Sequence, residues 1–218
     1  MTISVFDLFK IGIGPSSSHT VGPMRAAAMF AASATEDGLA SRIAAIRVEL
    51  FGSLGTTGHG HGSVKAIVLG LSGEQPDLVD PAAAQPLVDA VRETGILSLP
   101  GTAGIRFDVD EDVILHRRKR LPFHSNAMRF AAYDAAGAEL TARTYYSVGG
   151  GFVLGEDEAG QPAIVADATP VPYPFSTGAE LLAHTTATGL PVSGIMLANE
   201  LVRRDKAEVR EEIGRAHV

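Results

Sequence analysis

The sequence contains no cysteine among its 218 residues. The chain therefore forms no disulfide, and it provides no thiolate ligand to a zinc ion or an iron–sulfur cluster. It also has no run of about 18 consecutive apolar residues, so we expect no segment to span a membrane. Its first residues lack the basic-then-apolar pattern of a secretory signal peptide. These absences lead us to expect a cytoplasmic protein.

Positive charge is scarce as well, because 18 Lys and Arg residues stand against 25 Asp and Glu residues, for a net charge of -7. A nucleic-acid-binding domain needs a basic surface to replace the counterions on phosphates, so this balance argues against nucleic acid as a partner. The densest basic run, residues 116–120, is short. We interpret it as a solvated loop, and the alternative is a rim that attracts an anionic substrate.

Hydrophobic periodicity predicts an α+β domain over residues 1–170. Apolar residues recur at helical spacing in some segments and alternate in others, with Gly or Pro near the segment ends. The expected helices cover residues 20–34, 62–71 and 81–94, and the expected strands cover residues 47–51, 126–133, 139–148 and 152–154. Because the last three strands follow one another through short turns, we expect a mostly antiparallel sheet with helices packed on it.

The last part of the chain, residues 171–218, has a different character. Three prolines within residues 170–174 predict an extended linker. Thr177 and Glu180 have the spacing of a capping box, which predicts the start of a helix, and further helical segments follow. This short helical tail has too few residues to bury a core of its own. We therefore expect a linker and the truncated start of a second, helical domain.

Four hydroxyl residues surround a histidine just before the first long helix, as Ser16, Ser17, Ser18, His19 and Thr20. The N-terminus of a helix leaves backbone amides unpaired and carries a partial positive charge, which favours a carboxylate or phosphate there. One serine would suffice to cap the helix. The additional hydroxyls favour a site for a small anion, in which His19 is either a ligand or a structural member of the loop.

Two histidines, His59 and His61, lie in a glycine-rich segment. Residues two apart in an extended chain point to opposite sides, so a shared zinc ion would require the loop to bend and would need further ligands. The alternative is that one histidine is a general base and the other makes structural hydrogen bonds, since imidazole titrates near neutral pH. We favour the base and assign no metal ligand in this chain.

A third candidate pair is His124 and Asn126, at the entry to a predicted strand. Two residues apart in a strand lie on the same face of the sheet. An imidazole and an amide placed in this way can hold one polar ligand. The alternative is a pair of sheet residues that face solvent.

These candidates belong to four motifs that occur in order at residues 14–24, 57–62, 124–126 and 145–152, with the sequences GPSSSHTVGPM, TGHGHG, HSN and YYSVGGGF. Together they resemble the N-terminal β domain of bacterial iron–sulfur L-serine dehydratase (L-serine ammonia-lyase), over essentially the whole chain. Residues 196–200, with the sequence MLANE, resemble the opening helices of the catalytic α domain of that family.

The resemblance implies conversion of L-serine into pyruvate and ammonia, without pyridoxal phosphate. It implies a [4Fe-4S] cluster, one iron of which stabilises the departing hydroxide as a Lewis acid. His61 is then the leading candidate for the base that removes the α-proton, and His124 is the next. Asn126 and residues 16–20 would orient the polar groups of the substrate. The expected partners are L-serine, a cysteine-bearing α domain and a second copy of the chain in a homodimer.

The lack of cysteine departs from what the complete enzyme needs, because cysteine thiolates hold such clusters. We therefore expect a β-domain fragment that is inactive alone, and a separate β subunit is the alternative. The β domain of the family also resembles the allosteric substrate-binding domain of certain D-3-phosphoglycerate dehydrogenases. This implies another function, that of a regulatory module that binds serine or a similar acid. A third alternative is a scaffold for dimerisation and docking, in which the motif residues serve packing.

Overall fold

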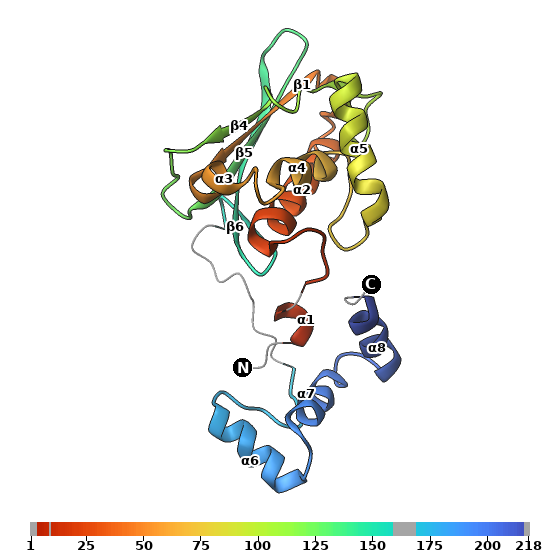
Figure 1. Cartoon of the computed structure of the whole chain (residues 1–218), viewed down its shortest axis with the longest axis vertical. Helices are drawn as coiled ribbons and strands as arrows, with labels where there is room; N and C mark the ends of the chain where they lie inside the picture. The colour runs from red at the N-terminus through yellow and green to blue at the C-terminus, as the bar shows by residue number, and fades with distance from the viewer. Residues whose placement is uncertain (1–3, 9, 159–168, 216–218) are drawn as a thin grey trace. The chain divides into compact units, whose positions relative to one another are not determined.

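The computed structural model describes residues 4–8, 10–158 and 169–215, and the account below concerns these residues (Figure 1). By their contacts, residues 12–163 belong to one compact unit, the larger unit, and residues 1–11 and 164–218 belong to another, the smaller unit. The domain boundary expected at residue 170 remains a prediction.

The larger unit has the predicted α+β fold. Its helices are the π-helical turn η1 (Ser17–Val21), α2 (Gly22–Glu36), the 3-10 turn η2 (Ala40–Arg42), α3 (Gly52–Thr57), α4 (Ser63–Leu71) and α5 (Pro81–Thr94). Its strands are β1 (Ala45–Phe51), β2 (Ile96–Leu97), β3 (Ile105–Arg106), β4 (Val113–His116), β5 (Asn126–Tyr133), β6 (Glu139–Gly149) and β7 (Phe152–Gly155).

Five strands form the main sheet, in the order β4-β1-β5-β6-β7, and β2 pairs with β3 in a separate two-stranded sheet. Three of the four pairings in the main sheet are antiparallel, and only that of β1 with β4 is parallel. The expected mostly antiparallel sheet is therefore confirmed. In the register of β1 with β5, Val48 lies opposite Phe130, which places both side chains on the same face of the sheet.

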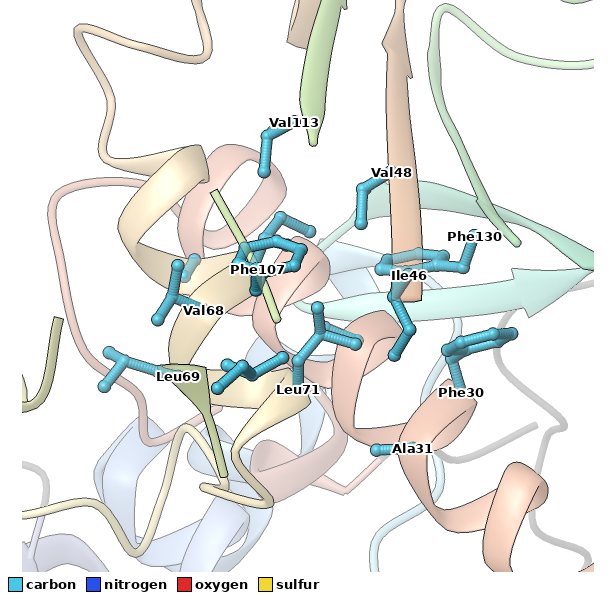
Figure 2. Packing of buried hydrophobic residues seen from close by; sticks show 14 of the residues in the cluster. Phe30, Ala31, Ile46, Val48, Val68, Leu69, Leu71, Phe107, Val113 and Phe130 are labelled. Carbon is cyan, nitrogen blue, oxygen red and sulfur yellow. The ribbon is translucent and has the colours of Figure 1, made fainter. Parts of the chain in front are cut away.

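The core lies between this face of the sheet and the helices α2 and α4 (Figure 2). Phe30 of α2 stacks on Phe130 of β5 with ring centroids 5.3 Å apart. Burial of each such side chain contributes about 2 kcal/mol. Helices α2 and α4 approach closely at Gly70, where a Cβ atom would lie 2.2 Å from the carbonyl oxygen of Met24. The start of α4 lies beside η1, where the candidate site lies, because the Ser63 hydroxyl donates to the carbonyl oxygen of His19.

Local sequence signals account for the elements that were predicted well. Helix α5 covers the predicted residues because Asp80 caps its start, with a 2.9 Å hydrogen bond from the amide of Ala82, and Gly95 ends it in a left-handed conformation.

Helix α3 and strand β4 were not predicted. The basic run 116–120 was expected to be a solvated loop, and His116 does not fit this expectation, because it ends β4 and its Nε2 lies 2.8 Å from a carboxylate oxygen of Glu49. Residues 117–120 are exposed.

The smaller unit is helical, and its helices are α1 (Val5–Leu8), α6 (Gly178–Thr188), α7 (Val192–Glu200) and α8 (Lys206–Arg215). The capping box of Thr177 and Glu180 is present at the start of α6, as predicted. The buried carboxylate of Glu200 accepts hydrogen bonds from the Ser4 hydroxyl at 2.8 Å and the Val5 amide at 2.7 Å, which tie α1 to α7.

Among the described residues, no single helix has the length and apolar character needed to cross a membrane. The pair α6 and α7 meets both criteria only when the two are taken together across a 95° bend.

Candidate active site

The serine-rich segment forms η1 and the residue that caps it. Ser16 is the cap, because its hydroxyl accepts a hydrogen bond from the amide of His19 at 3.2 Å. Its carbonyl oxygen also accepts from the amide of Thr20 at 2.9 Å. Capping therefore uses the hydroxyl of Ser16 and not those of Ser17 and Ser18 in the first turn, and the Ser18 hydroxyl lies 2.9 Å from Nδ1 of His19 and 3.5 Å from the Ser16 hydroxyl. The position of Ser17 and Ser18 at the start of a helix suits an anionic ligand.

Two buried serines from distant parts of the chain hold this segment in place. The hydroxyl of Ser63, at the start of α4, donates to the carbonyl oxygen of His19 at 2.5 Å. The hydroxyl of Ser147, near the end of β6, donates to the carbonyl oxygen of Ser18 at 2.8 Å. Both serines are fully buried. Because these bonds go to backbone carbonyls, they fix the path of the segment without using its side chains.

His61 lies beside this segment with one ring nitrogen fixed. The carbonyl oxygen of Thr57 lies 2.9 Å from Nδ1 of His61. A carbonyl oxygen only accepts, so Nδ1 carries the hydrogen and Nε2 of the neutral ring keeps a free lone pair. The side chain of His61 is exposed, and its backbone oxygen accepts from the Thr20 hydroxyl at 2.8 Å. The arrangement therefore presents a base to solvent at a fixed position.

The ring of His19 lies next to that of His61, with centroids 5.1 Å apart and planes tilted by 44°. Its Nδ1 lies 2.9 Å from the Ser18 hydroxyl and its Nε2 lies 3.0 Å from the Ser53 hydroxyl. Burial is the largest cause that lowers the pKa of His19, the charge of a protonated His61 lowers it further, and a hydrogen bond from the ring to the backbone of Ser53 raises it. Because the pKa is lowered from 6.5, His19 is neutral at pH 7.

This lowered pKa makes the stability of the larger unit depend on pH. The unfolded chain, in which the pKa of His19 is about 6.5, binds the proton more readily than the folded chain. The stabilisation of the folded state that comes from neutral His19 is therefore fully present above pH 6.5, and it is lost as the pH falls through the lower, folded-state pKa. We expect His19→Gln to flatten the fall in melting temperature between pH 7.5 and pH 5. Equal pH dependence of the two proteins would contradict this.

His124 and Asn126 do not lie on one face of a strand, as the sequence analysis expected. Strand β5 begins at Asn126, so His124 precedes it, and Nδ1 of His124 accepts a hydrogen bond from the backbone amide of Asn126 at 3.1 Å. Since an amide only donates, this bond uses the lone pair of Nδ1. His124 therefore forms a local turn, and its remaining nitrogen carries hydrogen when the ring is neutral.

Asn126 is buried, and its amide nitrogen donates to the carbonyl oxygen of Ser147 at 3.2 Å. This bond connects Asn126 to the serine-rich segment, because the Ser147 hydroxyl holds Ser18. Oδ1 of Asn126 is buried and has no hydrogen-bond partner among the described residues. An unpaired buried acceptor costs free energy, which is typical of functional sites.

The structure thus connects the predicted site residues through hydroxyls that the sequence analysis did not single out. Ser53 contacts His19, Ser63 holds the same segment from α4, and Ser147 joins it to Asn126. Ser147 lies in a motif that the analysis quoted, so its position was a signal, whereas Ser53 lies outside the four motifs. His124 enters this arrangement through Asn126, and the described contacts include none between His124 and His61.

The residues present do not fit the ligand set of an iron–sulfur cluster. The site offers hydroxyl, imidazole and amide groups but no thiolate, which is the ligand that such clusters require. In the part of the chain that the structure describes, no three His, Asp or Glu side chains are grouped to hold a metal ion, including those around His59 and His61.

Comparison with known proteins gives the family. The family model described as serine dehydratase beta chain matches residues 4–158. An L-serine dehydratase of Streptomyces coelicolor is 56% identical over 97% of this chain and 46% of its own length. L-serine dehydratase 1 of Escherichia coli is 42% identical over 99% of this chain and 46% of its own length. The chain spans about half the length of these relatives. On this evidence, the chain belongs to the serine dehydratase β-chain family.

Proposed function

We propose that this chain is the β part of an L-serine ammonia-lyase, which converts L-serine into pyruvate and ammonia. The observation that carries the proposal is the fixed ring of His61. Its Nδ1 is bonded to the carbonyl oxygen of Thr57, which leaves Nε2 free beside a hydroxyl-rich helix start. A base next to an anion site is what removal of a proton α to a carboxylate requires. Family membership and the names of the relatives support the same reaction.

In this proposal the serine-rich segment binds the substrate carboxylate. The first turn of η1 offers backbone amides and the hydroxyls of Ser17 and Ser18, with Ser16, His19 and Thr20 holding the turn in shape. The partial positive charge of the helix N-terminus adds to the attraction. Asn126 supplies a buried amide that orients another polar group of serine.

His61 then removes the α-proton with Nε2. His124 is less suited to this task, because its Nδ1 lone pair is used by the amide of Asn126. A neutral His19 beside His61 also avoids repelling the imidazolium that forms. Loss of the α-proton and of the β-hydroxyl, as water, leaves an aminoacrylate. Its imine tautomer takes up water and releases ammonia, which yields pyruvate.

We assign the [4Fe-4S] cluster to a cysteine-bearing α part of the enzyme, since this chain has no cysteine. Such a cluster would supply a Lewis acid for the departing hydroxide. We therefore expect the chain alone to be inactive. A homodimer is the further partner that we propose, because strands β4 and β7 end the sheet and leave edges at which a second copy can pair.

Anaerobic turnover of L-serine into pyruvate tests this proposal. It is measured after reconstitution with iron and sulfide, for the chain alone and for its mixture with a cysteine-bearing α part of an L-serine dehydratase. We expect activity only in the mixture. Activity of the chain alone would contradict the assignment of the cluster. Serine binding by the chain alone, unchanged by substitution of His61 and His124, would instead support a regulatory module.

A further inference from the structure

His61 lies in a glycine-rich loop. The loop covers residues 58–62, between α3 and α4, and three of its five residues are glycine. Glycine has no Cβ atom and adopts many backbone conformations, and Gly62 has a φ of +74°, which favours glycine. A base on such a loop keeps a fixed position only if other parts of the chain hold it.

Hydrogen bonds within and next to the loop fix its shape. The Thr57 carbonyl oxygen accepts from the backbone amide of His61 at 3.3 Å, and Nδ1 of the same histidine lies 2.9 Å from it. The amide of Ser63 donates to the carbonyl oxygen of Gly58 at 2.8 Å. All of these bonds join residues within 57–63, so they do not set the position of His61 relative to the serine-rich segment.

Two hydroxyls connect residues 57–63 to the serine-rich segment. The Ser63 hydroxyl donates to the carbonyl oxygen of His19, just after the loop ends. The hydroxyl of Thr20 lies 2.8 Å from the carbonyl oxygen of His61 itself. Among the described residues outside 57–63, Thr20 is the one that is hydrogen-bonded to His61. A carbonyl oxygen only accepts, so the Thr20 hydroxyl donates, and its hydrogen is not available to a ligand.

Thr20 can hold the loop because its own position is fixed. It is buried in η1, where its amide donates to the carbonyl oxygen of Ser16 at 2.9 Å. Its methyl group lies close to Gly14, where a Cβ atom would lie 2.5 Å from Cγ2 of Thr20. Because a β-branched side chain has few rotamers, a methyl group held against Gly14 leaves the hydroxyl directed at His61.

We propose that Thr20 is a positioning residue that acts through His61. Its hydroxyl holds the carbonyl oxygen of His61 and thereby keeps Nε2 of that ring beside the serine-rich segment, where the ring centroid lies 5.1 Å from that of His19. The role of His61 as the base rests on the proposed function. The hold of Thr20 on the loop does not, because it follows from the contacts of the chain itself.

Hydrogen exchange of the loop amides in the 218-residue chain tests this hold directly. Thr20→Val removes the hydroxyl with little change of shape. We expect the amides of residues 61–63 to exchange about tenfold faster in this variant, because one hydrogen bond is lost. Thr20→Ser keeps a hydroxyl and should restore slow exchange. Thr102→Val is the matched control, since it removes a similar hydroxyl bond, 2.7 Å long, to the carbonyl oxygen of Leu99. It should leave exchange of the loop amides unchanged.

Steady-state kinetics of the chain mixed with the cysteine-bearing α part test the consequence. We expect Thr20→Val to lower kcat for L-serine about thirtyfold with KM changed less than about twofold, because misplacing a catalytic group by about 1 Å costs up to about a hundredfold. Exchange of the α-hydrogen with deuterated solvent should slow by the same factor, which a loss of stability alone would not cause in the folded protein. Thr20→Ser should restore kcat, and Thr102→Val should leave it unchanged.

The results that would overturn the role of Thr20 differ from those that would overturn the proposed function. Loop amides that exchange at the same rate in Thr20→Val, an unchanged kcat, or a raised KM at unchanged kcat would each overturn the role of Thr20. Thr20→Ala, which removes the hydroxyl without adding a methyl group, takes the place of Thr20→Val if that variant does not fold. If the unaltered mixture fails to convert L-serine while the loop amides behave as expected, the proposed function fails and the hold of Thr20 on the loop stands.

Discussion

His61→Ala is expected to lower kcat for L-serine about a thousandfold in the enzyme reconstituted with its cysteine-bearing part. General base catalysis contributes about 10²- to 10⁴-fold, and the Nε2 lone pair of His61 is the free base that the Thr57 carbonyl leaves available. The substitution should leave the fold intact, because the side chain is exposed and the bond from Thr20 goes to the backbone oxygen of residue 61. Initial rates of pyruvate formation at saturating L-serine measure the effect.

His124→Ala is the matched comparison, since it removes the other histidine that the sequence marks as a base. We expect a smaller loss of kcat, about tenfold, because His124 bonds to the amide of Asn126 and its removal disturbs the position of that side chain. Exchange of the α-hydrogen with deuterated solvent separates the two roles, and it should stop in the His61 variant and continue in the His124 variant. The reverse order of effects would transfer the role of base to His124.

Where local sequence signals were strong, the fold followed from them. Helix α5 has a capping aspartate, a proline in its first turn and a glycine after its last residue, so both of its ends were predictable. Helix α3 has none of these signals. Its cap residue, Phe51, makes no side-chain hydrogen bond, and its first residues resemble a turn. It is held by tertiary bonds instead, such as that from the Ser53 amide to Ser125, which a local pattern does not show.

The candidate site shows the same division between local and tertiary information. Residue type indicated His61 and the serine-rich segment, because imidazole and clustered hydroxyls have few common roles in such a loop. The direction of each hydrogen bond was beyond the sequence, since it depends on which group lies opposite each ring nitrogen. A carbonyl opposite His61 and an amide opposite His124 make one ring a free base and the other an acceptor already in use. The roles of Ser53 and Ser147 likewise depend on contacts between distant segments.

Gly52→Ala is expected to lower the unfolding free energy of the larger unit by about 3 kcal/mol, because it combines strain with crowding. Gly52 has a φ of +57°, and a Cβ atom there would lie 2.2 Å from the carbonyl oxygen of Ser125. It joins β1 to α3, and its amide donates to the carbonyl oxygen of Lys119 at 2.8 Å. A shift at this point also moves Ser53 and Thr57, so activity should fall together with stability.

Gly137→Ala separates the two causes. Gly137 also has a positive φ, +83°, but nothing lies within 4 Å of a Cβ atom there, so its substitution adds strain without crowding. Gly137→Ala should lower the free energy of unfolding by about 1 kcal/mol. It should leave activity unchanged, because Gly137 lies in the turn between β5 and β6. Hydrogen exchange of the β1 and β5 amides in the larger unit measures both losses. Equal losses for the two variants would show that the segment of Ser125 moves aside without cost, and α3 would then not be held against the start of β5 as the structure has it.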